Sequence, residues 1–412
     1  MRVSTLQTFN IGLNNILNNQ TAVNNTQQQV STGRRVLTPA DDPVAATKIL
    51  QLQQDLALRD QFDRNLTAAE TRLRLEETSL ASINTSLTRL QELTVQAGGG
   101  SLTIQDRQAI AAEVDEIQLA LVDLFNTRDP SGEFIFAGFK GQNPPFERQE
   151  NGRYEYQGDE GQRILPIGPS TNVITGDTGK SLFVDVEAAD NSFTTFENPI
   201  NNGTLNINSG LVVDRDRYEE FYPDDIVITF NSESEITPHG PNFTVRRQSD
   251  NRVVDGLVNV GYNPSSDVVA AGISFSLTGE PQPGDEALIK STPKQSITDT
   301  IFRLELGLNT LEDNPTDSAT LDALIADTLT NLENAQTSIS EVRSQVGARL
   351  NIVDNTRNLS ADIELVNREV LSELADVDFA EAVSRLSLQS FLLEAAQQSY
   401  TTISRLSLFN QL

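Results

Sequence analysis

Apolar residues near the start of the chain recur at alternating steps of three and four positions. Polar Gln20 and Gln27 interrupt the series, whose apolar members are Leu6, Phe9, Leu13, Ile16, Val23 and Val30. This spacing predicts a helix with one narrow apolar stripe that packs against another helix. The stepping resumes after Pro43 and ends before the glycines at 98–100. At about 1.5 Å per residue this second helix would be roughly 80 Å long, which favours a rod over a compact globule.

The middle of the chain has a different composition and a different hydrophobic pattern. A shorter helix is predicted around Ile110 to Leu124, and "TRDPSG" marks a turn after it. The following "EFIFAGF" is interpreted as a strand. From about Phe146 to Lys290, Gly and Pro are frequent and short runs such as "LFVDV", "DIVITF", "NFTVRR", "GISFSL" and "EALIK" favour strands. We expect an antiparallel β domain inserted between helices.

Heptad spacing returns after the β-rich middle and continues to the end of the chain. The predicted fold class is α+β: an elongated antiparallel α-helical coiled-coil rod formed by both chain ends, with a β-hairpin and an inserted β-rich domain. The expected parts are terminal helices at 1–37 and 380–412, a helical rod with hairpin at 38–140 and 293–379, and an outer β-rich domain at 141–292.

The two chain ends are nearly free of charge. Arg2 is the only charged residue up to Gly33, and only Glu394 and Arg405 are charged after Leu386, although the chain carries a net charge of -28. One interpretation is a polar helix docked on its own core. The other is burial between identical subunits, where repeated charges would repel and amides can hydrogen-bond. We favour the second, with ends that stay disordered until assembly. The candidate interface is the first apolar series together with Leu392, Leu393, Ile403, Leu406 and Phe409.

Composition leaves little room for other functions. The chain has no Cys, which excludes thiolate chemistry, and 58 acidic residues against 30 basic ones disfavour nucleic acid and anionic membrane surfaces. No signal peptide or membrane span is predicted. With a single His and no Trp, we expect no catalytic, cofactor or metal site, although paired carboxylates in the β-rich middle leave an enzyme open as an alternative.

Three local motifs resemble ligand sites. "TGDTGKS" at 175–181 looks like the end of a phosphate loop, but Ile174 replaces the first Gly, so a Gly-rich β turn is expected. "DRDRYEEFYPDD" at 214–225 starts like a calcium loop, but Tyr218 replaces a ligand, which favours a solvated acidic loop. His239 lies in a predicted surface turn.

The stretch "GRRVLTPADDP" joins the first two predicted helices. Its two adjacent carboxylates, Asp41 and Asp42, could be an acid-base pair, but Asp42 directly precedes Pro43. Pro at the first helical position and Asp at the preceding cap are typical of a helix start. Gly33 would end the first helix, and Arg34 and Asp41 could pair with neighbouring subunits. We therefore predict a domain joint.

Several pieces together resemble one family. They are the opening "MRVST", the joint "STGRRVLTPADDPVAA", the run "LTVQAGGGSLTIQDRQAIAAEVDEIQ" through "FNTRDPSGEFIFAGF", and the ending "LADVDFAEAVSRLSLQSFLLEAAQQSYTTISRLSLFNQL". In this order they resemble the flagellin superfamily of bacterial axial proteins, over about residues 1–140 and 293–412. Within it, "TPADDPVAA" and the ending "LSLFNQL" favour a hook-filament junction protein over a flagellin filament subunit, which stays the alternative.

The resemblance implies a structural role in motility. It implies type III export without a cleaved signal, terminal helices in the inner tube of a ring or helical assembly, and a place in the extracellular flagellum. The implied partners are further copies of the chain, hook-associated protein 1, flagellin, and a cytoplasmic export chaperone that holds the C-terminal helix.

Overall fold

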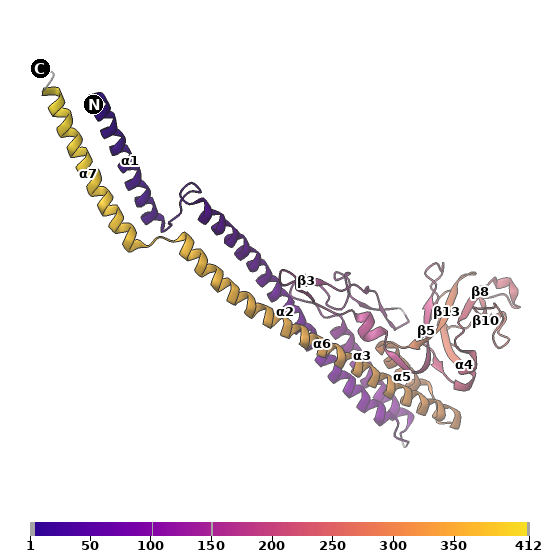
Figure 1. Cartoon of the computed structure of the whole chain (residues 1–412). Coiled ribbons are helices and arrows are strands. Elements are labelled where there is room, and N and C mark those ends of the chain that lie inside the picture. The colour runs from indigo at the N-terminus through magenta and orange to yellow at the C-terminus, as the bar shows by residue number, and fades with distance from the viewer. Residues whose placement is uncertain (1–4, 101, 150, 410–412) are drawn as a thin grey trace. The chain divides into compact units, whose positions relative to one another are not determined.

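Two compact units make up the chain in the computed structural model, which describes residues 5–100, 102–149 and 151–409. The first unit combines Met1–Leu66 with Asp354–Leu412, and the second is Thr67–Val353. Figure 1 shows long helices in both and strands in the second. In the described part of the chain, no helix has the length and apolarity that a membrane crossing requires. The α+β prediction is confirmed.

The first three long helices begin and end near the breaks predicted at Pro43, at the glycines 98–100 and at "TRDPSG". The helices are α1 (Thr5–Thr32), α2 (Pro43–Ala97), α3 (Ile104–Phe125), α5 (Ile297–Thr310), α6 (Pro315–Ala375) and α7 (Phe379–Phe409). Helix α2 has 55 residues and α6 has 61, and both contribute to the two units. The start of α3 has a capping box, in which Thr103 and Asp106 satisfy each other's amides.

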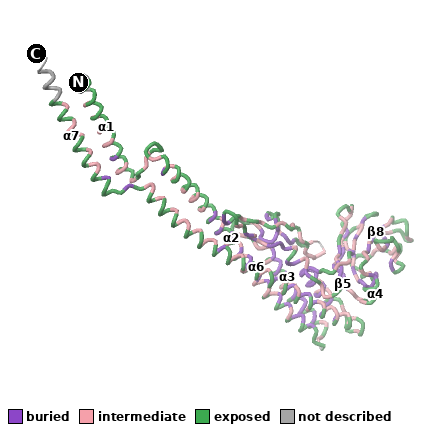
Figure 2. Tube along the Cα trace, viewed as in Figure 1, coloured by how far each residue is buried: buried purple, intermediate pink, exposed green. Residues whose placement is uncertain are grey.

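A helical core fills one side of the second unit. The heptad positions of α2 predicted from the sequence are fully buried there, among them Leu73, Leu80 and Leu87. Leu80 and Leu87 pack with Val114 of α3 and with Ile339 of α6 in one continuous cluster. Figure 2 shows this concentration of buried positions, in contrast to the mostly exposed terminal helices. The residues that form this helical core are therefore far in sequence from both chain ends.

The strands are short and pair antiparallel. Two small hairpins are β1 (Phe146–Arg148) with β2 (Tyr154–Tyr156), and β3 (Ile164–Pro166) with β4 (Asn172–Ile174). A five-stranded sheet has the order β10 (Val260–Gly261), β9 (Asn242–Arg247), β8 (Ile226–Asn231), β13 (Glu286–Lys294) and β5 (Glu187–Glu197). A second sheet joins β11 (Asp267–Ala270), β12 (Ile273–Thr278), β6 (Asn206–Ile207) and β7 (Leu211–Val212). Both sheets enclose a second apolar core.

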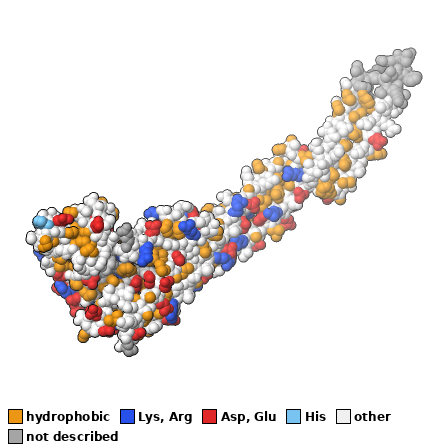
Figure 3. Space-filling view, turned by 180° about the vertical axis from the view of Figure 1, so that it is seen from behind, with side chains coloured by type: hydrophobic (Ala, Val, Ile, Leu, Met, Phe, Trp, Pro, Cys, Tyr) orange, Lys and Arg blue, Asp and Glu red, His pale blue; other side chains and the backbone are white. Residues whose placement is uncertain are grey.

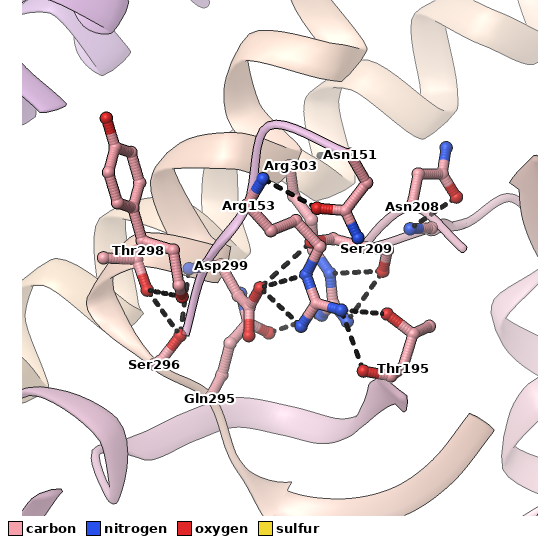
Figure 4. A network of polar contacts seen from close by, with 12 residues as sticks. Asn151, Arg153, Thr195, Asn208, Ser209, Gln295, Ser296, Thr298, Asp299 and Arg303 are labelled. Carbon is pink, nitrogen blue, oxygen red and sulfur yellow. Dashed lines mark hydrogen bonds and ion pairs between the residues drawn. The ribbon is translucent and has the colours of Figure 1, made fainter. Parts of the chain in front are cut away.

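A buried polar network joins this β-rich part to helix α5 (Figure 4). Arg153 donates to the Thr195 carbonyl at 2.8 Å and to the Asp299 carboxylate at 3.2 Å. Arg303, one turn after Asp299 on α5, donates to carbonyls of β5 and of the segment around Ser209. Because each charged group is hydrogen-bonded, the network can be buried without an unsatisfied charged side chain.

Three local predictions are wrong. "EFIFAGF" forms turns, with a single bridge from Phe134 to Arg128, because its Ile135 and Phe136 are buried in the helical core instead of pairing along a strand. "LFVDV" lies largely in the short π-helix η1 (Lys180–Val184). The acidic run at 214–225 contains helix α4 (Arg215–Phe221), since Asp214 caps it and Tyr218 and Phe221 bury one face.

The remaining motifs have no ligand-site geometry. The segment 175–179 is largely buried and irregular instead of forming the predicted Gly-rich β turn, and it leads into η1. His239 is exposed, beyond the 3-10 helix η2 (Glu233–Glu235), as predicted. No cluster of potential metal ligands occurs among the residues that the structure describes.

Candidate assembly surface

Helices α1 and α7 lie side by side and antiparallel in the first unit (Figure 1). Near one end, Arg385 donates to the Gln29 side chain at 2.9 Å. Near the other, Gly12 faces Tyr400 so closely that an added Cβ would come within 3.1 Å of the ring. The absence of a side chain at Gly12 thus allows close helix contact.

The less exposed positions of each helix follow heptad steps. On α1 they include Gly12, Ile16, Asn19, Val23, Thr26 and Val30, and on α7 they include Ala382, Leu386, Gln389, Leu393, Ala396 and Tyr400. The predicted positions Ile16, Val23, Val30 and Leu393 belong to this seam. The predicted positions Leu13, Gln20 and Gln27 are exposed, and small or polar neighbours take their places.

Among the described seam residues, only Thr26 and Ala382 are buried. The larger apolar side chains of the seam stay partly exposed, so the pair buries little apolar area and has a thin core. Five predicted interface residues cannot be placed, because the side chains of Leu6, Phe9, Ile403, Leu406 and Phe409 lie outside the described residues, although their backbone is helical. Two helices joined this weakly depend on further contacts for stability.

A second apolar face of α7 points away from α1. Leu388, Phe391 and Leu392 are 58%, 66% and 47% exposed, and Ala395 follows on the same side. Their spacing of i, i+3, i+4 and i+7 is typical of a helix face that packs in a groove. Figure 3 shows few charged side chains on the described part of the terminal helices. Sequence reasoning missed Leu388 and Phe391, although this spacing could have indicated them.

The joint after α1 pairs with the break between α6 and α7. Gly33, with φ +72, accepts a hydrogen bond from the Val377 amide at 2.9 Å. Arg35 donates its amide to the Ala375 carbonyl at 2.7 Å and its guanidinium to Leu374. The break between α1 and α2 therefore lies beside the break between α6 and α7. A positive φ is easy only for glycine, which explains Gly33 at the end of α1.

The carboxylate pair in the joint has local structural roles. Asp42 accepts from the Ala45 amide at 2.9 Å, and Pro43 is the first residue of α2, which is the geometry of a capped helix start. Asp41 accepts from the Thr38 amide at 2.7 Å, and bonds from Thr38 hold the pKa of Asp41 below its ordinary value. Because both carboxylates are engaged as acceptors within the joint, an acid-base role is disfavoured.

An exposed cavity of about 280 Å³ lies beside the joint. Arg34 lines it together with Val36, Ile49, Leu371 and other residues of the first unit. The Arg34 side chain is exposed. Gln53, Arg368 and Asp376 are also among its lining residues, so the walls of the cavity combine apolar and charged groups.

Comparisons with known proteins agree on one family. The bacterial flagellin N-terminal helical region matches residues 3–140, and the C-terminal helical region matches residues 329–412, so together they cover more than half of the chain. Flagellar hook-associated protein 3 of Escherichia coli is 24% identical over 99% of both chains. The protein of that name from Salmonella typhimurium is 33% identical over 44% of this chain and 57% of its own length.

A solved structure supports the same relationship. The flagellar junction protein FlgL from Legionella pneumophila is 28% identical, with a TM-score of 0.50, over 80% of this chain and 99% of that one. The chain belongs to the bacterial flagellin family and is similar to proteins of that family named flagellar hook-associated protein 3.

Proposed function

We propose that this chain is an extracellular structural component of the bacterial flagellum and joins the hook to the filament, where it is required for motility. The relatives named for hook-associated protein 3 and the family of both helical regions support this role. A flagellin filament subunit is the less well supported alternative. Catalysis forms no part of the proposal, since the similar proteins are structural parts of flagella.

Assembly uses the terminal helices. The observation that carries this proposal is the exposed apolar face of α7 around Phe391, on a helix pair whose own seam is only partly buried. Such a face is stable in water only when further copies or neighbouring proteins cover it. The terminal segments 1–37 and 380–412 then form the inner tube, and pairing between subunits offsets the entropy lost when they become ordered.

The remaining parts have distinct places in this proposal. Segments 38–140 and 293–379 form the rod and hairpin shell, and 141–292 forms the outer β-rich domain. The neighbours are hook-associated protein 1 on the hook side and flagellin on the filament side. Before export without a cleaved signal, a cytoplasmic chaperone covers the C-terminal helix, whose spacing of apolar anchors suits a groove. Arg34 and Asp41 contact neighbouring subunits at the joint.

A single substitution tests the assembly role. Phe391→Ser removes the largest anchor of the exposed face without touching the seam with α1, so the purified chain should keep its helix content. In a strain that lacks the wild-type chain, we expect this variant to leave cells without attached filaments and non-motile. Ser387→Ala, on the polar side of α7, is the matched control and should restore motility. Normal filaments with Phe391→Ser would contradict the proposal.

A second measurement distinguishes a hook-filament junction protein from a flagellin filament subunit. Quantitative composition of sheared flagella should find this chain as a trace component at the hook end. A bulk component of the filament would instead identify a flagellin subunit.

A further inference from the structure

The segment 175–179, singled out in the sequence for its glycines, is docked between α2 and α6 in the second unit. Thr175, Asp177 and Thr178 are buried. The Asp177 amide donates to Glu76 Oε1 of α2 at 2.9 Å. The Asp177 carboxylate accepts two hydrogen bonds from Arg349 of α6, at 2.7 and 3.2 Å. One residue of this segment thus connects to both rod helices.

Further charged groups surround this contact. Arg72, one turn before Glu76 on α2, pairs with Asp129 at 3.0 Å and lies 3.7 Å from Glu133. Arg163, which precedes β3, also pairs with Glu133. An added Cβ at Gly176 would lie 3.4 Å from Arg72 Nε, so the docked segment also covers this arginine.

The charges in this cluster do not balance. Its four carboxylates are Glu76, Asp129, Glu133 and Asp177, and its three guanidinium groups are Arg72, Arg163 and Arg349. One carboxylate therefore has no cation of its own. An uncompensated charge away from water is costly, and such a group becomes neutral instead.

Glu76 is the carboxylate in excess. It is 1% exposed, and its Oε2 has no hydrogen-bond partner among the described residues. Burial, followed by the charge of Asp177, raises the pKa of Glu76 from an ordinary 4.5 to about 7, against the opposing effects of the Asp177 amide, Arg349 and Arg72. Asp129, by contrast, accepts from Ser131 and the Glu133 amide and has a lowered pKa.

We propose that Glu76 holds a proton while segment 175–179 is docked, and that this contact is a pH-sensitive lock between the rod helices and the segment leading into the β-rich part. Undocking exposes Glu76 to water, where it ionises, so docking takes up a proton. The folded contact is therefore favoured in acid and weakened as pH rises. The opening equilibrium should increase by up to about tenfold per pH unit between roughly 4.5 and 7, and then level off.

Hydrogen exchange of the Asp177 amide in the full-length chain tests this lock. After correction for the intrinsic pH dependence of exchange, the opening equilibrium of the wild-type chain should be more than about tenfold larger at pH 7 than at pH 5. Glu76→Gln keeps an uncharged group at every pH and should abolish this dependence. Glu77→Gln, which removes an exposed partner of Arg343, is the matched control and should keep it.

Two results would overturn the proposal. One is equal corrected exchange of the wild-type amide at both pH values, and the other is a Glu76→Gln variant that follows the wild-type dependence. A measurement on the wild-type chain alone covers the case in which the variant does not fold. Infrared spectra of the folded chain should contain a protonated buried carboxyl band at pH 6 that is lost at pH 9, and absence of the band at pH 6 would also refute the lock.

Discussion

Arg303 is the most fully engaged side chain of the buried network in Figure 4. Its guanidinium donates to Phe193 O at 2.6 Å, Gln295 Oε1 at 2.7 Å, Ser192 Oγ at 2.9 Å and Ser209 O at 3.2 Å. It also lies 4.2 Å from the centre of the Phe193 ring. Burial lowers the pKa of Arg303 to about 10, so the group stays charged at neutral pH.

Arg303→Met should strongly destabilise the second unit. The substitution keeps an unbranched apolar side chain, but it removes every donor and leaves Asp299 with Arg153 as its remaining cation. Removing one member of a buried ionic network costs about 3–5 kcal/mol. At roughly 2–4 °C per kcal/mol for a large domain, we expect the melting temperature of this unit to fall by about 10 °C.

Tyrosine fluorescence during urea unfolding can measure this change, because five of the six tyrosines lie between Tyr154 and Tyr262 and the chain has no Trp. Arg252→Met is the matched control, since the Arg252 side chain is 84% exposed and its loss should cost less than about 1 kcal/mol. A cost below about 1 kcal/mol for Arg303→Met would refute the reasoning.

The pH dependence gives an independent check on the same network. Burial alone would raise the pKa of Asp299, but Arg153 and Arg303 hold it below its ordinary value. A carboxylate with a lowered folded-state pKa stabilises the fold above its unfolded pKa, and this stability is lost as the pH falls through the folded value. Without Arg303, acid unfolding should begin at a higher pH than in the wild-type chain.

Two further predictions concern a helix cap and two phenols, one half-buried and one buried. Asp42→Ala removes the acceptor for the Ala45 amide and should lower helix stability by about 0.5–2 kcal/mol; unchanged amide exchange in the first turn of α2 would contradict the cap. Burial raises the pKa of Tyr156 and Tyr218 to about 12, so an ultraviolet titration should find these phenols ionising after the others, with stability lost between about pH 10 and 12. Simultaneous ionisation of all phenols in the folded chain would contradict this.

The long helices could be predicted because their signals are local and repeated. Positions such as Leu80 and Leu87 are seven residues apart and both fully buried, and Pro43 and the glycines after Ala97 mark the ends of α2. Strand β8 could also be predicted from the sequence, since its side chains alternate between buried and partly buried positions. In these elements, apolar residues recur in the sequence with the same spacing as the buried positions in the structure.

Apolar runs without a clear period were misinterpreted. Phe183 in η1 is buried by stacking on Phe125 of α3, with ring centres 4.1 Å apart, and Phe136 packs against Phe183 edge to face. These contacts join residues far apart in the chain, and a short apolar run does not distinguish a strand from a buried turn. The sequence contains enough information to predict helix α4, because Asp214 is a typical cap and Tyr218 and Phe221 are three residues apart.

The terminal helices show a different limit of sequence reasoning. A heptad series fixes the spacing of a contact stripe, but a helix with two neighbours has two stripes, whose positions interleave along the sequence. On α7, Leu393 belongs to the seam with α1 while the adjacent Leu392 lies on the exposed face. Such a helix cannot satisfy both faces within one chain. The same feature that blurs the sequence pattern therefore favours assembly, since the second apolar face needs a neighbour outside the chain.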